Sequence, residues 1–214
     1  MKLQFLTLAF VFLFAFSVSV ANDGKYIEAM QKNIKTIYEA KTISDFQNAV
    51  NAFERIASVE TKKWEPLYYI AFGNIMLSNA ETDNAKKDQY LDLASAAIAN
   101  AAVINGKESE IVALEGFVLM MRISIDPQSR GMMYAQEATQ AFNKALSLNP
   151  GNPRAMALLA QMQFGSAQFF GAPATEACES NVKAHEQMAN YRSENPLAPS
   201  WGKGMIESLM EKCK

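Results

Sequence analysis

One pattern of residues returns four times along the chain, at intervals of 45, 44 and 46 residues. Each copy has a small residue, a bulky apolar residue four positions later and a packing residue three positions after that, often followed by a helix breaker. The copies are Ala49, Phe53, Ile56 and Thr61; Ala94, Ile98, Ala101 and Gly106; Ala138, Phe142, Ala145 and Pro150; Ala184, Met188, Tyr191 and Pro196. Offsets of four and seven place these residues on one helical stripe, and the small residue lets a neighbouring helix approach closely. The sequence therefore predicts repeated, closely packed helices.

A second small residue accompanies the first three copies, eighteen positions after the bulky residue, at Ala71, Gly116 and Ala160; in the last copy this position is Ile206. Pro150 and Pro196 each follow a stripe and end the helix, because proline lacks the amide hydrogen and clashes with the preceding turn. Each repeat is thus expected to contain two helices joined by a break.

The third copy, continued by Pro153-Arg154-Ala155 and Leu159-Ala160, resembles the tetratricopeptide repeat (TPR). The marks of the pattern cover most of residues 45–206, but their period of about 45 exceeds the 34 residues of a TPR, so the chain is similar to a divergent TPR-like protein. The resemblance implies an all-α helical-repeat solenoid of about four antiparallel helix pairs with a C-terminal capping helix. Such units cannot bury their faces alone, so they stack into one cooperative domain.

The breakers and apolar stripes place the individual helices. We expect them over residues 25–40, 44–59, 64–78, 84–104, 109–123, 131–148, 153–164, 174–193 and 200–213, with Ser44 and Gln47 forming the capping box of the second. Gly, Pro, Asn and Asp cluster at 79–84, 125–131 and 165–173, which we expect to be the turns within each pair. No window alternates in the manner of a strand, so no sheet is expected.

The first residues have the features of a secretory signal peptide. Met1-Lys2 precedes a largely apolar run from Leu3 to Phe16, and small residues stand three before and one before a cut after Ala21. A membrane anchor is the alternative, but the stretch is barely the roughly 20 residues that span a bilayer, and no positive cluster follows it. We therefore predict a secreted or periplasmic protein without a membrane span after cleavage, and a single repeat domain over residues 22–214.

The charged and nucleophilic residues exclude several classes of function. Twenty basic and 22 acidic residues give a net charge of −2 without a long basic block, so nucleic acid is not an expected partner. The single histidine, His185, is followed by Glu186, but Ala189 stands where the second ligand of a zinc protease would be. There is no phosphate-binding glycine loop and no Gly-x-Ser-x-Gly elbow. We therefore predict no catalysis, no metal and no cofactor.

The two cysteines are expected to form a structural disulfide. A secreted chain passes through an oxidising compartment, where an even number of cysteines tends to pair. Cys178 lies near the start of the helix expected over 174–193, and Cys213 lies near the end of the one over 200–213. In an antiparallel hairpin of these helices the two thiols reach the same level, because both lie about 20 Å from the turn at 1.5 Å per residue.

TPR arrays commonly bind partners along the concave surface lined by the first helix of each unit. Carried over by position, the resemblance selects an apolar and aromatic face made of Tyr68, Phe72, Ile75, Ala113, Phe117, Met120, Arg154, Ala157, Gln161 and Phe164. Tyr68 and Phe72 occupy the places where the carboxylate-clamping Lys and Asn of some TPR domains would be sought, so a receptor for chaperone tails is not supported. The alternative is that these side chains pack the longer helices against each other.

The interpretation that these features favour is a TPR-like module or scaffold that binds a protein partner. A first alternative is an accessory protein of a transport system, in which the groove and the tip over residues 165–171 enclose a small apolar ligand. A second alternative is an enzyme, which would need a polar cluster around a buried His185.

Overall fold

The computed structural model describes residues 23–214, so the predicted signal peptide, residues 1–21, lies outside the described residues. A helix over residues 23–39 is followed by α2 (Ile43–Val59), α3 (Glu65–Ala80), α4 (Asn84–Asn105), α5 (Ser109–Ile125), α6 (Pro127–Leu148), α7 (Pro153–Phe170), α8 (Thr175–Asn190) and α9 (Lys203–Lys212). Residues 23–214 contain no strand, and none of their helices is long and apolar enough to cross a membrane. The all-α prediction is confirmed.

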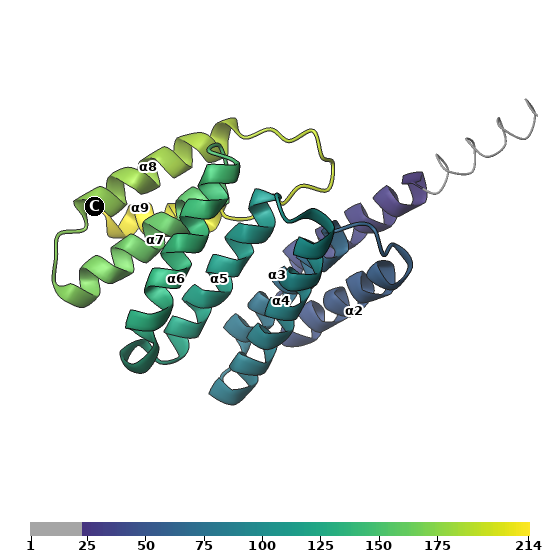
Figure 1. Cartoon of the computed structure of the whole chain (residues 1–214), viewed down its shortest axis with the longest axis horizontal. Helices are drawn as coiled ribbons and strands as arrows, with labels where there is room; N and C mark the ends of the chain where they lie inside the picture. Colours follow the sequence, from purple (N-terminus) through teal and green to yellow (C-terminus); the bar gives the residue numbers. More distant parts are fainter. Residues whose placement is uncertain (1–22) are drawn as a thin grey trace, which may run out of the picture.

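The helices pack as consecutive antiparallel pairs that stack along the molecule (Figure 1). The 23–39 helix precedes α2, α3 pairs with α4, α5 with α6, and α7 with α8, while α9 packs on α8 and α7. Because α5 also contacts α3 and α7, these three first helices form an inner layer, and α4, α6 and α8 flank it. This is the predicted TPR-like solenoid with a C-terminal capping helix.

The repeated small residues are the contact points between helices, as the pattern predicted. Ala71, Ala94, Ala138 and Ala160 are completely buried, and Phe142 is completely buried with them. A Cβ atom on Gly116 in α5 would collide with the ring of Phe142 in α6. The small residue of the first helix, Gly116, therefore leaves room for the bulky ring of Phe142 in the second helix. This close contact brings the two helices of a unit together.

Two of the predicted turns are shorter than expected, because the flanking helices extend into the ranges 125–131 and 165–173. Asp126 alone separates α5 from α6, since its carboxylate accepts the amide of Ser129 as an N-cap and Pro127 starts the new helix without needing a donor. At the other turn α7 continues to Phe170 and ends at Gly171, whose φ of 64° is a left-handed conformation that glycine adopts without steric cost.

The predicted capping box of the second helix is displaced by two residues. Thr42, not Ser44, is the N-cap of α2, and its hydroxyl accepts the amide of Asp45 at 3.1 Å. The carboxylate of Asp45 in turn accepts the amide of Thr42 at 2.9 Å, which completes the box. Asp45 thus takes the N3 position of the box, where Glu or Gln is usual.

The predicted disulfide between Cys178 and Cys213 is present, with their Cα atoms 5.7 Å apart. It joins the first turn of α8 to the end of α9 and packs against a small cluster of Ala160, Phe164, Ala177 and Leu209. The short terminal helix is thus fixed covalently at its end. The disulfide closes the α8–α9 hairpin at the end opposite the segment that connects the two helices.

The contact between Gly116 and Phe142 can be tested by adding one methyl group. Gly116→Ala should lower the free energy of unfolding by about 1 to 3 kcal/mol, because the methyl overpacks the ring. Gly165→Ala in α7 is the matched control: a Cβ there meets no atom within 4 Å, so helix propensity should leave stability equal or about 0.5 to 1 kcal/mol higher. Chemical denaturation measures both, and an equal effect of the two variants would contradict the helix register.

The disulfide is tested by removing both thiols together. The double variant Cys178→Ser, Cys213→Ser should lose about 3 to 4 kcal/mol of unfolding free energy, as expected for a closed loop with a sequence separation of 35. Denaturant titration measures the loss. In the wild type, thiol titration of the unfolded, non-reduced chain should find no free cysteine, and two free thiols would refute the pairing.

Candidate functional site

The concave face of the solenoid is covered by the chain's own C-terminal segment. This segment, residues 191–202, is called the strap here; it leaves α8, crosses the inner helices and returns to α9 (Figure 1). Leu197 of the strap is buried, and its carbonyl accepts a hydrogen bond of 2.8 Å from the Tyr69 hydroxyl of α3. The strap therefore occupies the surface on which TPR arrays usually receive a partner.

Trp201 is the main anchor of the strap. Its indole stacks between Phe72 of α3 and Phe117 of α5, with ring centroids 5.3 and 5.6 Å away. The indole nitrogen donates a 2.8 Å hydrogen bond to the hydroxyl of Tyr68. A large ring with its one donor satisfied gains both apolar burial and stacking, so this contact contributes strongly to holding the strap on the inner layer.

Two further polar contacts fix the course of the strap. The backbone amide of Ser200 donates to the hydroxyl of Tyr38 in the 23–39 helix at 3.1 Å. The side-chain amide of Asn195 donates to the carboxylate of Glu65 at the start of α3 at 3.3 Å. The strap thus contacts the first helix of the described chain as well as the start of α3.

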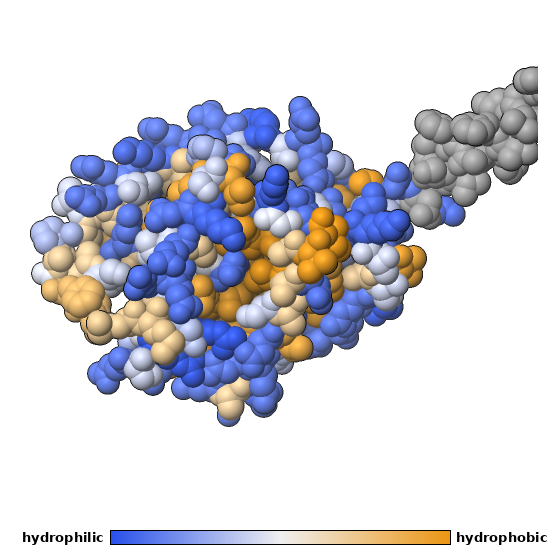
Figure 2. Space-filling view, in the orientation of Figure 1, coloured by the Kyte–Doolittle hydropathy of each residue, from blue (hydrophilic) through white to orange (hydrophobic). Residues whose placement is uncertain are grey.

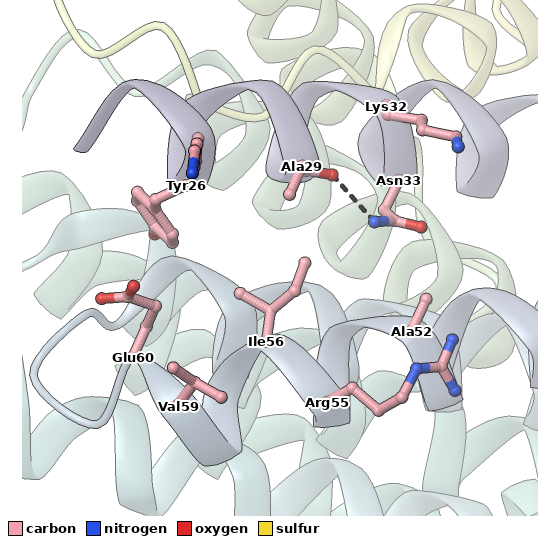
Figure 3. A pocket seen from close by; sticks show the side chains of 10 residues that line it. Tyr26, Ala29, Lys32, Asn33, Ala52, Arg55, Ile56, Val59 and Glu60 are labelled. Carbon is pink, nitrogen blue, oxygen red and sulfur yellow. Dashed lines mark hydrogen bonds between the residues drawn. The ribbon is translucent and has the colours of Figure 1, made fainter. Parts of the chain in front are cut away.

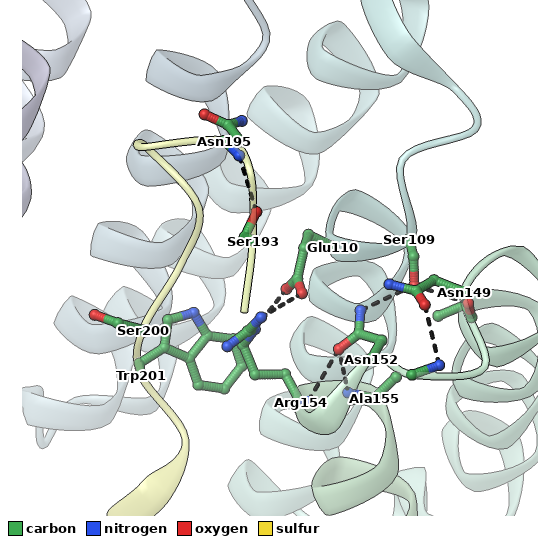
Figure 4. Close-up of polar contacts among 12 residues, drawn as sticks. Ser109, Glu110, Asn149, Asn152, Arg154, Ala155, Ser193, Asn195, Ser200 and Trp201 are labelled. Atoms are coloured by element: carbon green, nitrogen blue, oxygen red, sulfur yellow. Dashed lines mark hydrogen bonds and ion pairs between the residues drawn. The ribbon is translucent and has the colours of Figure 1, made fainter. Parts of the chain in front are cut away.

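A buried ion pair lies beside the strap (Figure 4). Nε and Nη2 of Arg154 in α7 donate to the two carboxylate oxygens of Glu110 in α5, at 2.8 and 2.7 Å. The Arg154 guanidinium also lies 4.7 Å from the ring centroid of Tyr191, the first residue of the strap, and its Nη1 is buried without a protein partner. The bidentate pair joins two neighbouring units of the solenoid at their strap-facing ends.

Arg154 stays cationic and Tyr68 stays neutral near neutral pH. Burial alone would lower the pKa of Arg154, but the hydrogen bonds and charge of Glu110 outweigh it, and the pKa lies above its ordinary value. Burial, followed by the charge of Glu110, raises the pKa of Tyr68 well above its ordinary value. A cationic Arg154 and a neutral phenol therefore suit a structural network rather than proton transfer.

The structure brings the predicted groove residues together and buries most of them. Fully or almost fully buried are Tyr68, Phe72, Ile75, Ala113, Phe117, Arg154, Ala157 and Phe164. Met120 and Gln161 are half-buried, and the Gln161 amide donates to the Met205 carbonyl of α9. These side chains therefore pack within the protein, as the alternative interpretation of the sequence expected. The strap and α9 cover the face on which a partner would otherwise bind.

An open apolar pocket lies instead at the far end of the helices, between the start of α6 and the end of α7. It has a volume of about 390 Å³ and is called the tip pocket here. Its walls are Ile123, Pro127, Gly131, Met132, Ala135, Gln136, Met162, Gly165, Ser166, Phe169 and Phe170. Apolar side chains gather over these ends of α6 and α7 at the lower left of the molecule in Figure 2.

The rim of the tip pocket exposes large apolar side chains to solvent. Met132 is 84% exposed, Phe169 62% and Phe170 72%, and the two phenylalanine rings meet edge to face at 5.2 Å. An exposed aromatic and methionine rim around an apolar pocket is typical of a binding surface. The tip over residues 165–171, named in the ligand-binding alternative, supplies one wall. The other wall, with Met132, was missed because Met132 lies in the part of the helix expected over 131–148 that precedes Ala138, the first residue of the repeated pattern there.

Residues 23–214 contain no group of three or more His, Cys, Asp or Glu side chains that could hold a metal ion. His185 is half-buried on α8, away from the walls of the tip pocket.

Comparisons with known proteins give one similarity that informs function. No protein-family model matches the chain, and no curated protein is significantly similar to it. Among solved structures, the HusA haemophore from Porphyromonas gingivalis is 27% identical, with a TM-score of 0.79 over 88% of this chain and 92% of that chain. TTC0263, a TPR protein of Thermus thermophilus, is 17% identical with a TM-score of 0.43 over 85% of this chain and 99% of that chain. MamA is 16% identical with a TM-score of 0.29 over 80% and 99%.

The TM-scores of TTC0263 and MamA are too low to support an argument about function. The class of this protein therefore follows from its fold, from the tip pocket and from the similarity to the HusA haemophore. The chain is a TPR-like helical module of the binding or interaction type. The protein most informative for it is the HusA haemophore, to which it is similar over nearly the whole length of both chains. The disulfide and this similarity are consistent with a location outside the cytoplasm.

The burial of the concave face can be tested on its two sandwiching rings. Phe72→Ala and Phe117→Ala should each lower the free energy of unfolding by about 3 to 5 kcal/mol, as for a large core residue. The exposed Phe170→Ala is the matched control and should change stability by less than about 1 kcal/mol. Denaturant titration measures all three, and losses near zero for Phe72 and Phe117 would mean that the strap does not hold the face closed.

Proposed function

We propose that the protein is a secreted or periplasmic carrier that binds a flat, apolar ligand of the tetrapyrrole class, such as haem, in the tip pocket. The observation that carries the proposal is the open apolar pocket with an exposed aromatic and methionine rim at the ends of α6 and α7. The similarity to a haemophore supports the choice of ligand class. The signal peptide expected to be cleaved after Ala21 would bring the protein to the compartment where such a carrier works.

The chemistry of the walls indicates how the ligand would be held. Phe169 and Phe170 offer aromatic faces and edges to a conjugated ring, and Met132 and Met162 offer flexible, polarizable thioethers. Ser166 and Gln136 are the polar side chains of the walls. Recognition would therefore rest on dispersion and on the removal of apolar surface from water, with few hydrogen bonds.

The iron of a haem would contribute less to the binding free energy than the tetrapyrrole ring. No His, Cys or Tyr side chain lines the tip pocket, and thioether sulfur is the one kind of wall atom that commonly binds haem iron. A metal-free tetrapyrrole presents the same faces to the same walls. We therefore expect the pocket to accept both forms.

A protein partner, expected from the resemblance to TPR proteins, stays a prediction. The concave surface that such arrays commonly use is filled by the strap, so a partner would have to contact another surface. A partner that accepts the ligand would contact the exposed rim of the tip pocket, because the ligand would leave the pocket there.

Binding is tested by titrating the chain that begins at Asn22 with haemin and with metal-free protoporphyrin, following the ligand's absorbance. Both should bind at one site with dissociation constants within about tenfold of each other, since the ring supplies most of the contact area. The double variant Met132→Ala, Phe169→Ala should weaken both by tenfold or more, because two exposed anchors are lost.

Val103→Ala in α4 is the control, because Val103 is also strongly exposed but lies away from the tip pocket. It should bind like the wild type. Unchanged affinity in the double variant, or an equal loss in the control, would exclude the tip pocket as the site. Binding of haemin alone would contradict recognition through the ring.

A further inference from the structure

A second groove of different character lies at the other end of the chain, between the 23–39 helix and α2 (Figure 3). It has a volume of about 520 Å³. Its floor and sides are Tyr26, Ala29, Ala52, Ile56 and Val59, with the charged or polar Lys25, Lys32, Asn33, Arg55 and Glu60 around them. This combination of an apolar floor and cationic edges is absent from the tip pocket.

The groove is polar at one end and apolar along its middle. Lys32 and Arg55 lie at the same end in Figure 3, one on each of the two helices. From there the groove passes Ala29 and Ile56 and continues to Val59, which is 76% exposed although apolar. From Lys32 to Tyr26 the 23–39 helix rises by about 9 Å.

The opposite end of the groove is closed by contacts within the protein. The hydroxyl of Tyr26 donates to Glu65 at 3.2 Å, and the ammonium of Lys63 lies 5.2 Å from the Tyr26 ring centroid while it pairs with Asp23 at 3.3 Å. Glu60, the acidic residue of the lining, also stands at this end. The negative charge of the groove therefore lies away from Lys32 and Arg55.

The cations at the open end are not neutralised by the protein. Within residues 23–214 neither Lys32 nor Arg55 takes part in an ion pair, although nearby Lys35 pairs with Glu39. Two unpaired cations at the same end of an apolar groove, one on each helix, attract an anion that carries an apolar chain, because charge and apolar surface are both complementary.

We infer that this groove binds a single-chain anionic amphiphile, with its carboxylate between Lys32 and Arg55 and its alkyl chain along Ala29, Ile56 and Val59. A nucleic acid would need a longer run of cations, and the groove offers only Lys25 besides these two. A cationic or neutral amphiphile would leave both charges without a partner. The site is independent of the tip pocket and of the ligand proposed for it.

The first experiment tests head group and chain length by calorimetric titration of the chain that begins at Asn22, below the micelle concentration of each probe. Decanoate should bind saturably with one site per chain and at least tenfold more tightly than decyltrimethylammonium or decanol. Each added methylene from hexanoate to decanoate should tighten binding by up to about fourfold while it still finds groove surface. Equal affinity for the anionic and cationic probes would overturn the proposal.

The second experiment places the site with charge-reversed variants. Lys32→Glu, Arg55→Glu should weaken decanoate binding at least tenfold, whereas Lys144→Glu, Lys183→Glu, which changes the net charge equally at two exposed residues outside the groove, should leave it within twofold. Val59→Asp should also weaken it, and the exposure of Val59 predicts an unchanged thermal midpoint. Equal losses in both double variants would show a general charge effect and refute the site.

Decanoate could also enter the apolar tip pocket, and the variant Met132→Ala, Phe169→Ala separates the two sites. This variant should retain decanoate binding while it loses tetrapyrrole binding. If it loses decanoate instead, the groove between the 23–39 helix and α2 is not the amphiphile site, whatever the outcome for the tetrapyrrole.

Discussion

The stacking of Trp201 between Phe72 and Phe117 determines how the rest of the molecule is arranged. A helical-repeat array exposes a concave face of large apolar side chains unless something covers it. Here the strap covers it, and the disulfide between Cys178 and Cys213 fixes the far end of α9, the helix that follows the strap. Inner helices buried by neighbours on two sides and by the strap on a third can be apolar almost throughout, as α3 and α5 are.

The ion pair of Glu110 and Arg154 depends on the same cover. A charge pair taken out of water loses solvation that its mutual attraction only partly restores, so such a pair persists where geometry and surrounding groups are favourable. Here two hydrogen bonds hold the guanidinium in one plane, and Tyr191 of the strap closes over it. The pair contributes less to net stability than to the alignment of α5 with α7, because a bidentate contact tolerates little sliding.

The sequence predicted the parts of the fold that depend on local periodicity. The small and bulky marks, such as Gly116 and Phe142, indicated the helix pairs and their contact points, and the cysteine positions indicated the disulfide. The strap was not predictable, because Trp201 and Tyr68 are 133 residues apart and the polar, proline-containing stretch before Trp201 reads as a loop. The concave residues could therefore be placed on one face but not assigned to groove or core.

The tip pocket follows from the length of the helices. The period of about 45 residues, longer than the 34 of a TPR, gives α6 22 residues and α7 18, or about 33 and 27 Å along their axes. The strap crosses near the N-terminal ends of α3 and α7, where Glu65 and Arg154 lie, and leaves the opposite ends uncovered. The apolar side chains of Met132, Phe169 and Phe170 are exposed there as a rim. With the strap on the concave face, the longer helices therefore leave an exposed apolar surface at their tips.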